Sequence, residues 1–365
     1  MQIPRFLSAV PFPLALLLVA ACADKPAAAA TSAAGDSVRH AVQASVVAAA
    51  DTDTVKTAAD PMRTRSDTSA IAARADSAGA DSTSAAAKAR KRAARDSVVW
   101  PTDRPAPLPG ALLPSHRIVA FYGNPLSKRM GILGELPPDQ MLAKLERTAK
   151  EWAAADSTTT VKPALHLIVT VAQATPGRDG KHRLRMSDSL IERVARWAEE
   201  RNWLLFLDVQ IGQSSVRAEL PRLMPYLRRP YVHLALDPEF AMRNGAKPGK
   251  RIGTMDASEI NEAIDSLISV VDANQLPPKI MLVHRFTTKM LTNYRKIRTD
   301  ARAQVVIDMD GFGSPQLKRG TWKAVILREP VWYTGFKLFY KNDKPMLKPA
   351  EVLKLRPAPL YIQYQ

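Results

Sequence analysis

Residues 204–210 read Leu-Leu-Phe-Leu-Asp-Val-Gln, and residues 232–239 read Val-His-Leu-Ala-Leu-Asp-Pro-Glu. Each stretch is an apolar run of strand length that ends in acidic or amide side chains. The segment Val216–Arg228 between them has a helical pattern. Strands that are apolar almost throughout, instead of alternating, are typical of parallel strands covered on both faces. The two runs and the segment between them therefore predict a strand–helix–strand unit of a parallel sheet.

The same alternation continues on both sides of this unit. The candidate strands are Arg117–Gly123, Ala164–Val171, Leu204–Gln210, Val232–Leu236, Lys279–His284, Gln304–Met309, Gly335–Tyr340 and Leu360–Tyr364. The candidate helices are Pro138–Ala154, Ser187–Arg201, Val216–Arg228, Ala257–Ala273, Thr287–Arg298, Pro315–Leu327 and a short one at Pro349–Leu355. Ser187 and the stretch Asp256-Ala-Ser-Glu259 have the spacing of helix N-caps.

Eight strand–helix alternations in about 250 residues predict an α/β fold, the closed (β/α)8 TIM barrel. An open doubly wound sheet is the alternative. It is disfavoured because the first strand is followed by Gly123-Asn-Pro, which is not a glycine-rich phosphate loop. The chain ends right after the eighth strand, so the usual last helix is missing. We expect the segment Pro101–His116 to cover that gap.

The N-terminus has the pattern of an export signal. Arg5 is followed by the apolar run Pro13–Ala21, which is too short to span a bilayer. The run ends Val19-Ala-Ala-Cys22, which resembles a bacterial lipobox, and Cys22 is the only cysteine in the chain. The resemblance implies an acylated Cys22 and an extracytoplasmic lipoprotein held to membrane lipid in the cell envelope. An ordinary signal peptide with a chance cysteine is the alternative.

The segment after Cys22 is predicted to be an unstructured tether. Residues 23–104 are mostly Ala, Ser, Thr and Asp, with Trp100 as the only Phe, Tyr or Trp. Such a composition cannot bury enough apolar surface to offset the entropy of ordering the chain. The predicted organisation is a signal peptide at 1–21, a disordered tether at 22–105 and a barrel domain at 106–365.

The charge of the 365-residue chain limits its partners. The formal net charge of +17 favours anionic neighbours such as lipid head groups or acidic polysaccharide, and it is equally consistent with basic residues covering the outer helices. No stripe of basic and aromatic residues suggests nucleic-acid binding. One cysteine excludes an intramolecular disulfide and a thiol-rich metal site. Nothing in the sequence indicates an oligomeric state.

Acidic residues gather at the ends of three candidate strands, where barrel enzymes carry their chemistry. Period-two geometry puts Asp208 and Gln210 on one face, and likewise Asp237 with Glu239 and Asp308 with Asp310. Unpaired buried carboxylates are costly, so the set indicates a functional pocket or pairing with neighbouring basic groups. A single Asp can instead cap the next helix. Other candidate site residues are Tyr122, Asn124, Gln173, His284, Arg285, Trp332, Lys337 and Tyr340. His166 and His233 begin strands and are expected at the opposite end.

Four motifs together resemble a family of secreted and lipid-anchored bacterial barrel proteins that are glycoside-hydrolase-like in fold. They are Leu234-Ala-Leu-Asp-Pro-Glu-Phe240, Gly253-Thr-Met-Asp-Ala-Ser-Glu-Ile-Asn261, Asp310-Gly-Phe-Gly313 and Gly335-Phe-Lys-Leu-Phe-Tyr340. The similarity runs from about Arg117 to the C-terminus. It implies the barrel fold and an exported location, and it assigns no catalytic residue.

A glycoside hydrolase is the preferred function, because such enzymes use two carboxylates. The seventh strand has no acid, so the pair is expected at the fourth and sixth strands, from Asp237 or Glu239 and Asp308 or Asp310. The preferred roles are Glu239 as general acid/base and Asp310 as nucleophile or base, with Asp208 raising the acid's pKa by repulsion. Sugar contacts are expected from Tyr122, Gln210, Trp332 and Tyr340.

Three alternatives stay open. A divalent-metal-dependent hydrolase would hold Mg²⁺ or Mn²⁺ mainly through oxygen ligands from Asp208, Asp237, Glu239, His284 and Asp310. A non-catalytic lipoprotein would bind wall glycan, and Lys337 could form a Schiff base, although such a lysine more often pairs with a carboxylate. No His-x-His or His-Glu-x-x-His spacing is present, so the preferred reading has no metal and no other cofactor.

Overall fold

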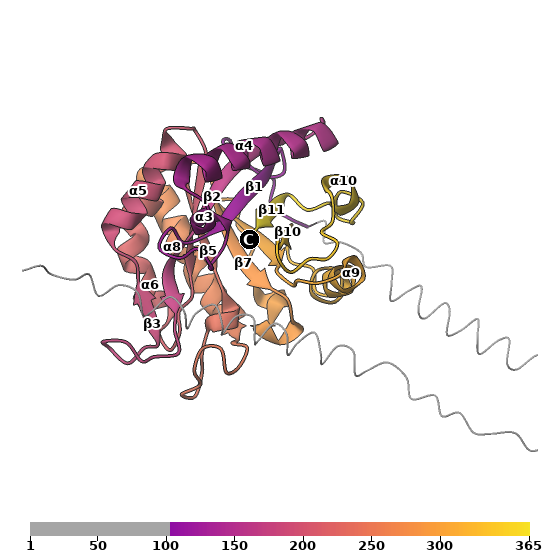
Figure 1. The fold of residues 1–365 in the computed structure, drawn as a ribbon. Coiled ribbons are helices and arrows are strands. Elements are labelled where there is room, and N and C mark those ends of the chain that lie inside the picture. The colour runs from indigo at the N-terminus through magenta and orange to yellow at the C-terminus, as the bar shows by residue number, and fades with distance from the viewer. Residues whose placement is uncertain (1–102) are drawn as a thin grey trace, which may run out of the picture. The chain divides into compact units, whose positions relative to one another are not determined.

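Eight parallel strands close on themselves within residues 103–365, the part of the chain that the computed structural model describes (Figure 1). The strands are β1 (His116–Gly123), β2 (Thr160–Ala172), β4 (Leu204–Val209), β5 (Val232–Leu236), β7 (Lys279–Arg285), β9 (Ala303–Met309), β10 (Tyr333–Leu338) and β11 (Tyr361–Tyr364). Their order in the sheet follows the sequence, and β1 pairs with both β2 and β11. This closure confirms the predicted (β/α)8 barrel and excludes the open sheet.

Helices of very different lengths surround the barrel. The longer ones are α4 (Pro138–Ala155), α5 (Asp188–Glu199), α8 (Ala257–Asn274) and α9 (Pro315–Trp322), and the π-helical turn η5 (Lys323–Leu327) extends α9. The shorter ones are α3 (Ile132–Glu135), α6 (Val216–Glu219), α7 (Met224–Leu227) and α10 (Pro349–Val352), with the 3₁₀ turns η1 (Leu220–Leu223), η2 (Pro238–Phe240), η3 (Thr288–Met290) and η4 (Tyr294–Lys296). Three short strands lie outside the barrel: β3 (Arg183–Arg185), β6 (Met255–Asp256) and β8 (Leu291–Thr292).

The two predicted N-caps are confirmed. The Ser187 side chain accepts a hydrogen bond from Leu190 N, and Asp256 and Glu259 form a capping box at the start of α8. In the described residues we find no helix with the length and apolarity needed to cross a bilayer.

Two helix predictions fail, one for a local reason and one because of a distant partner. Val216–Arg228 is divided into α6, η1 and α7, because Pro221 and Pro225 lack an N–H and interrupt the helical hydrogen bonds. The prediction of a helix at Thr287–Arg298 is wrong. There Leu291–Thr292 pairs with β6 instead, and Asn293 has a positive φ of 55°.

The apolar core has two shells, separated by the wall of the barrel. The outer shell lies between the strands and the surrounding helices and includes Trp152 and Trp322. The inner shell fills the barrel and includes Phe206, Leu282 and Tyr361. Because successive strand residues point to opposite faces, each strand supplies both shells. Polar residues at the strand ends that continue the inner set therefore point into the barrel.

A segment before β1 closes the N-terminal end of the barrel. Leu113 is fully buried in the inner shell. Its backbone N–H donates to Gln304 Oε1 at 3.1 Å, and its carbonyl accepts from Gln304 Nε2 at 2.7 Å. We expected Pro101–His116 to cover the side left open by a missing last helix. The structure corrects this, since Leu113 enters the barrel from its end.

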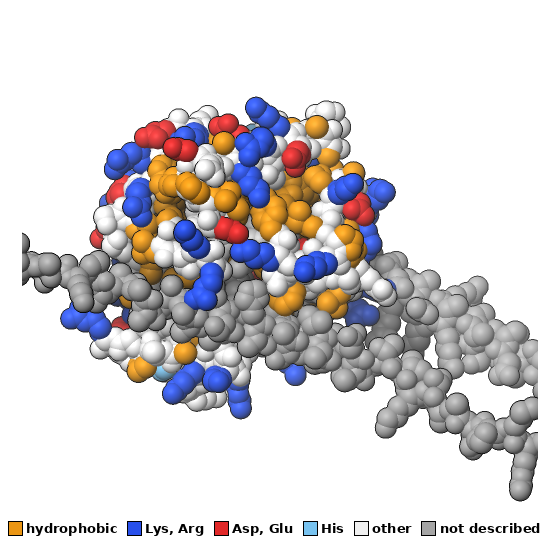
Figure 2. Space-filling model, viewed as in Figure 1, with side chains coloured by type: hydrophobic (Ala, Val, Ile, Leu, Met, Phe, Trp, Pro, Cys, Tyr) orange, Lys and Arg blue, Asp and Glu red, His pale blue; other side chains and the backbone are white. Residues whose placement is uncertain are grey.

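The predicted signal peptide (1–21), the lipidation site Cys22 and the tether up to residue 102 lie outside the described residues. The predicted barrel domain lies within them. On the face shown in Figure 2, Lys and Arg side chains are spread among acidic and apolar ones and do not form one continuous band.

Candidate functional site

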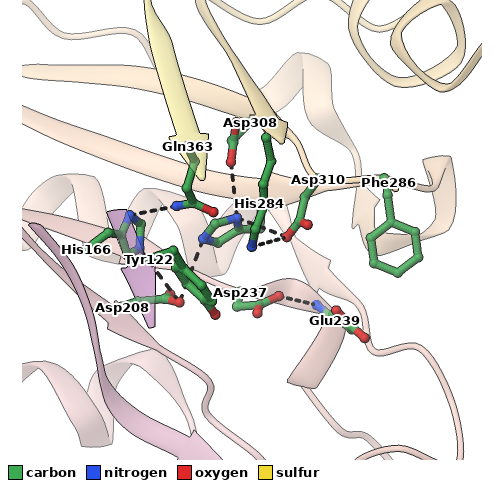
Figure 3. A network of polar contacts seen from close by, with 12 residues as sticks. Tyr122, His166, Asp208, Asp237, Glu239, His284, Phe286, Asp308, Asp310 and Gln363 are labelled. Carbon is green, nitrogen blue, oxygen red and sulfur yellow. Dashed lines mark hydrogen bonds and ion pairs between the residues drawn. The ribbon is translucent and has the colours of Figure 1, made fainter. Parts of the chain in front are cut away.

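The C-terminal end of the barrel interior is lined by polar side chains from most of the strands (Figure 3). They are Tyr122 (β1), His166 (β2), Asp208 (β4), Asp237 (after β5), His284 (β7), Asp308 and Asp310 (β9 and its end), Lys337 (β10) and Gln363 (β11). All of them are buried. We refer to these residues together as the polar layer.

His284 lies at the centre of the polar layer, between three carboxylates. Its Nδ1 is 3.1 Å from Asp310 Oδ2 and 3.4 Å from Asp308 Oδ2. Its Nε2, on the other side of the ring, is 3.7 Å from Asp208 Oδ2. Two strands, β4 and β9, therefore bring three acids to one imidazole, as the strand-end prediction required for Asp208, Asp308 and Asp310.

Burial and charge pull the pKa values of this group in opposite directions. Burial lowers the pKa of His284, but the charge of Asp208 and the contacts with Asp308 and Asp310 outweigh it and raise that pKa to about 10. Burial raises the pKa of Asp208, yet the charge of His284 together with His166 brings it below its ordinary value. The pKa of Asp308 is raised, chiefly by burial. Without another cation, the imidazole of His284 is therefore protonated at neutral pH.

His166 belongs to the polar layer, which corrects the prediction that it lies at the opposite end. Strand β2 begins at Thr160, earlier than predicted, so His166 is well inside it and pairs in register with Tyr122. Its Nδ1 is 2.6 Å from Tyr361 Oη and 2.9 Å from Gln363 Nε2, and its ring stacks on Phe206. Burial lowers the pKa of His166 to about 4, so it is neutral. His166 and Gln363 were not among the predicted site residues, although Gln363 lies at a predicted strand end.

Lys337 pairs with a carboxylate, as expected for a lysine in this position. Its Nζ is 3.5 Å from Asp310 Oδ2 and 3.8 Å from the centroid of the Tyr122 ring. Asp310 thus has one carboxylate oxygen between an imidazole and an ammonium group. Both neighbours restrict the orientation of this side chain.

Gln210 links the polar layer to Asp237. Its Nε2 donates to Tyr122 Oη and to Asp237 Oδ2, each at 3.3 Å, and its Oε1 accepts from Ala172 N. Asp237 Oδ1 accepts from Glu239 N at 3.2 Å and so caps η2. The prediction that Asp237 and Glu239 share a strand face is wrong, because β5 ends at Leu236 and a 3₁₀ turn follows.

Glu239 follows β5 beside an open pocket. Its carbonyl accepts a hydrogen bond from Gly253 N at 2.6 Å, and Gly253 is one of the residues that line a cavity of about 430 Å³. The loop segments 241–246 and 251–254 form the walls, and they contribute Arg243 and Arg251. The backbone of Glu239 is thus one residue contact away from this cavity, while its side chain is buried.

Three predicted site residues lie elsewhere. Arg285 follows His284 in β7 and points outward, where it bonds Thr288 O, Val325 O and the Glu329 carboxylate. Trp332 precedes β10, at the opposite end of that strand, and stacks on Tyr333. Tyr340 stacks on Tyr364 and lies under Lys144 of α4, outside the barrel. The structure thus corrects the expected positions of all three.

Asn124 and Gln173 occupy the loops after β1 and β2. Asn124 Nδ2 donates to Ile168 O, and its Oδ1 accepts from Leu126 N, so its side chain braces the loop. Gln173 pairs with His182 through its backbone N–H. No contact of either side chain with the polar layer is found in the described residues.

Comparison with known proteins adds little to what the structure itself shows. A scan of protein-family models and a search of curated proteins both found no match to this sequence. Among solved structures, the chain is similar to a ruminal GH26 endo-β-1,4-mannanase, with 10% identity and a TM-score of 0.34. The match covers 74% of this chain and 65% of the mannanase, which is less than two thirds of that protein's length. A likeness at this level supports no argument about activity.

Proposed function

We propose that the barrel is a glycoside hydrolase that uses Asp310 as nucleophile or base and Glu239 as general acid/base. The observation that carries this proposal is the setting of Asp310, whose Oδ2 lies between His284 Nδ1 and Lys337 Nζ. Glu239 follows β5, and Asp310 follows β9. Only β7 separates these two strands in the sheet, so both acids belong to the same end of the barrel.

The neighbours of Asp310 suit attack on an electron-poor anomeric carbon. The Nδ1–H of His284 and the ammonium of Lys337 orient Asp310 through its Oδ2, so that its carboxylate can act on the reacting centre or its water. Glu239 would protonate the leaving oxygen. Asp208 contacts His284 and His166, so its role in this scheme is to hold His284 rather than to repel the acid.

The substrate class follows from the pocket beside Glu239. Arg251 lines it together with Arg243, whose guanidinium also contacts the Glu259 carboxylate, and guanidinium groups favour carboxylate-bearing or otherwise anionic ligands. We therefore propose an acidic polysaccharide of the cell envelope or its surroundings as substrate. The lipid anchor at Cys22 and the extracytoplasmic location remain part of this proposal, since they would place the barrel next to such a polymer.

Release of reducing ends from a panel of polysaccharides tests the proposal. The panel contains uronic-acid polymers, peptidoglycan glycan strands and neutral β-mannan, each incubated with the full chain. Glu239→Gln and Asp310→Asn should each lower turnover by at least about 100-fold, because each removes a group that acts in the transition state. Glu200→Gln is the matched control, since the Glu200 side chain is 57% exposed and remote from the polar layer.

Two results would contradict the proposal. One is turnover by Glu239→Gln and Asp310→Asn equal to that of Glu200→Gln. The other is polysaccharide binding by the wild-type chain with no cleavage of any polymer in the panel. The second result would favour the alternative of a glycan-binding lipoprotein.

A further inference from the structure

Three side chains of the polar layer meet around a common point. Asp208 Oδ2 is 3.8 Å from His166 Nε2 and 3.7 Å from His284 Nε2. One potential ligand atom from each residue lies within 4.8 Å of the other two, and all three side chains are fully buried. They come from β2, β4 and β7, so the rigid wall of the barrel fixes their positions.

The facing atoms lack hydrogen-bond partners. Within the described residues, neither oxygen of Asp208 has one, nor has His166 Nε2 or His284 Nε2. Buried polar atoms without partners are unusual and costly. The separations of 3.7 and 3.8 Å exceed a hydrogen bond. They are close to the distance of about 3.4 Å between two ligands of a tetrahedral metal ion with bonds of about 2.1 Å.

The opposite nitrogens of both imidazoles are held by other groups. His166 Nδ1 is 2.6 Å from Tyr361 Oη, which can accept a hydrogen bond from an Nδ1–H, and His284 Nδ1 faces Asp308 and Asp310. Metal-binding histidines have this arrangement, in which one nitrogen binds the ion and the other is oriented by a carboxylate, hydroxyl or similar partner. Both rings therefore present Nε2 toward Asp208.

We propose that His166, Asp208 and His284 bind a divalent transition-metal ion. Two imidazole nitrogens and one carboxylate oxygen suit Zn²⁺, Mn²⁺, Fe²⁺ or Co²⁺ better than Mg²⁺ or Ca²⁺, which prefer oxygen ligands. The site differs from the oxygen-rich one considered from sequence, because His166 replaces Asp237, Glu239 and Asp310. A set of three protein ligands leaves a coordination position for water or substrate.

A divalent cation at this point would balance the negative charge of the surrounding carboxylates. Asp208 is a ligand, and Asp308 lies behind His284 with oxygens that have no hydrogen-bond partner in residues 103–365. A metal on His284 Nε2 leaves the ring proton on Nδ1, where it faces Asp310 Oδ2 at 3.1 Å. The ion would thereby fix the orientation of Asp310. The metal site itself does not depend on the proposed sugar cleavage.

Metal binding by the chelator-treated full chain tests this inference. Co²⁺ is the probe, because its visible absorption reports the number of ligands. We expect one Co²⁺ per chain, a spectrum of four- or five-coordination, and displacement by Zn²⁺. His166→Gln and Asp208→Asn should weaken Co²⁺ binding by more than about 100-fold, and Tyr361→Phe, which removes the hydroxyl facing His166 Nδ1, should weaken it by about 10- to 100-fold. His233→Gln is the matched control, since His233 is buried in the same barrel at its other end.

Failure of the wild-type chain to retain Co²⁺ or Zn²⁺ after gel filtration would overturn the inference. So would equal Co²⁺ affinities of His166→Gln and His233→Gln. Circular dichroism checks that each variant is folded. If His166→Gln is unfolded, the stoichiometry and spectrum of the wild-type chain still test the inference. A nonspecific site would give the spectrum of octahedral Co²⁺, whereas the proposed site gives that of four- or five-coordinate Co²⁺. Stoichiometric metal binding without sugar cleavage would contradict only the proposed function, and cleavage by a chain that binds no metal would contradict only this inference.

Discussion

The two ends of the barrel interior bury polar side chains in different ways. At the N-terminal end, Gln304 bonds the backbone of Leu113, and His233 Nδ1 accepts a hydrogen bond from Ile280 N at 3.1 Å. At the C-terminal end, the polar layer consists of side chains that face one another. The polar side chains at the N-terminal end bond backbone groups, which hold the fold together. We therefore interpret these side chains as structural. The acidic and basic side chains of the polar layer contact one another, and a ligand can replace one of these contacts.

Two buried lysines on the barrel strands also differ in their partners, although Lys279 points out of the barrel and Lys337 points into it. Burial lowers the pKa of Lys279 to about 7, and its neighbours are neutral carbonyl groups. Lys337 is equally buried, but it faces the Asp310 carboxylate and the Tyr122 ring. Burial alone therefore does not distinguish structural from functional residues, whereas the kind of partner does.

Removal of the Leu113 side chain should give the largest loss of stability. Leu113→Ala leaves a cavity at the N-terminal end, and we expect the free energy of unfolding to fall by about 2–5 kcal/mol. Urea unfolding measures it. Leu126→Ala is the control, since Leu126 is 65% exposed and its change should stay within about 0.5 kcal/mol. Loss of Co²⁺ binding by a folded Leu113→Ala variant would contradict the comparison, because the two ends of the barrel interior would then not be independent.

Metal should stabilise the chain through the C-terminal end only. With free Zn²⁺ at about 100 times its dissociation constant, the free energy of unfolding should rise by about 2.7 kcal/mol. The rise should vanish in Asp208→Asn and persist in Leu113→Ala. Thermal unfolding with and without Zn²⁺ measures it. An equal rise in wild type and Asp208→Asn would place the bound ion elsewhere.

Gln304 tests whether the N-terminal polar groups are structural. Gln304→Ala removes two hydrogen bonds to Leu113 and should lower the free energy of unfolding by about 1–3 kcal/mol. Sugar cleavage and Co²⁺ affinity of the folded variant should match wild type. A loss of either one, measured at a temperature where the variant is folded, would contradict the comparison.

The loops at the C-terminal end have their own anchor, which should show the smallest effect. Asp256→Ala removes the N-cap of α8 and should cost about 0.5–2 kcal/mol. Hydrogen bonds from Thr292 and then from Ser258 and Asn293 lower the pKa of Asp256. A lowered folded-state pKa contributes stability above the ordinary carboxyl pKa that is lost as pH falls. The difference between wild type and variant in urea unfolding should therefore shrink below about pH 4, and a constant difference would exclude this carboxylate as its source.

The sequence predicted the barrel well because its signals are local. Val232–Leu236 was predicted with its observed bounds, since a short apolar run between prolines has one reasonable reading. The failed helix at Thr287–Arg298 depended on a distant partner. The Asp256 carboxylate accepts hydrogen bonds from Thr292 and Asn293 across 36 residues and more, and no local pattern contains that information.

The candidate site was predicted in part for the same reason. Asp208, His284 and Asp310 were identified because strand ends are visible in the sequence. His166 was missed because the start of β2 was placed four residues late, which moved it to the wrong end of the barrel. Arg285 was included wrongly, although its neighbour His284 points inward and period-two geometry turns Arg285 outward.

Azide rescue of Asp310→Ala tests the central claim, that the polar layer is catalytic, most directly. With an activated aryl glycoside of the sugar found in the polysaccharide panel, Asp310→Ala should be inactive alone. Azide can enter the space left by the carboxylate and attack the anomeric carbon, so it should restore turnover and yield a glycosyl azide of inverted configuration. Turnover by Asp310→Ala at the wild-type rate without azide would contradict the account.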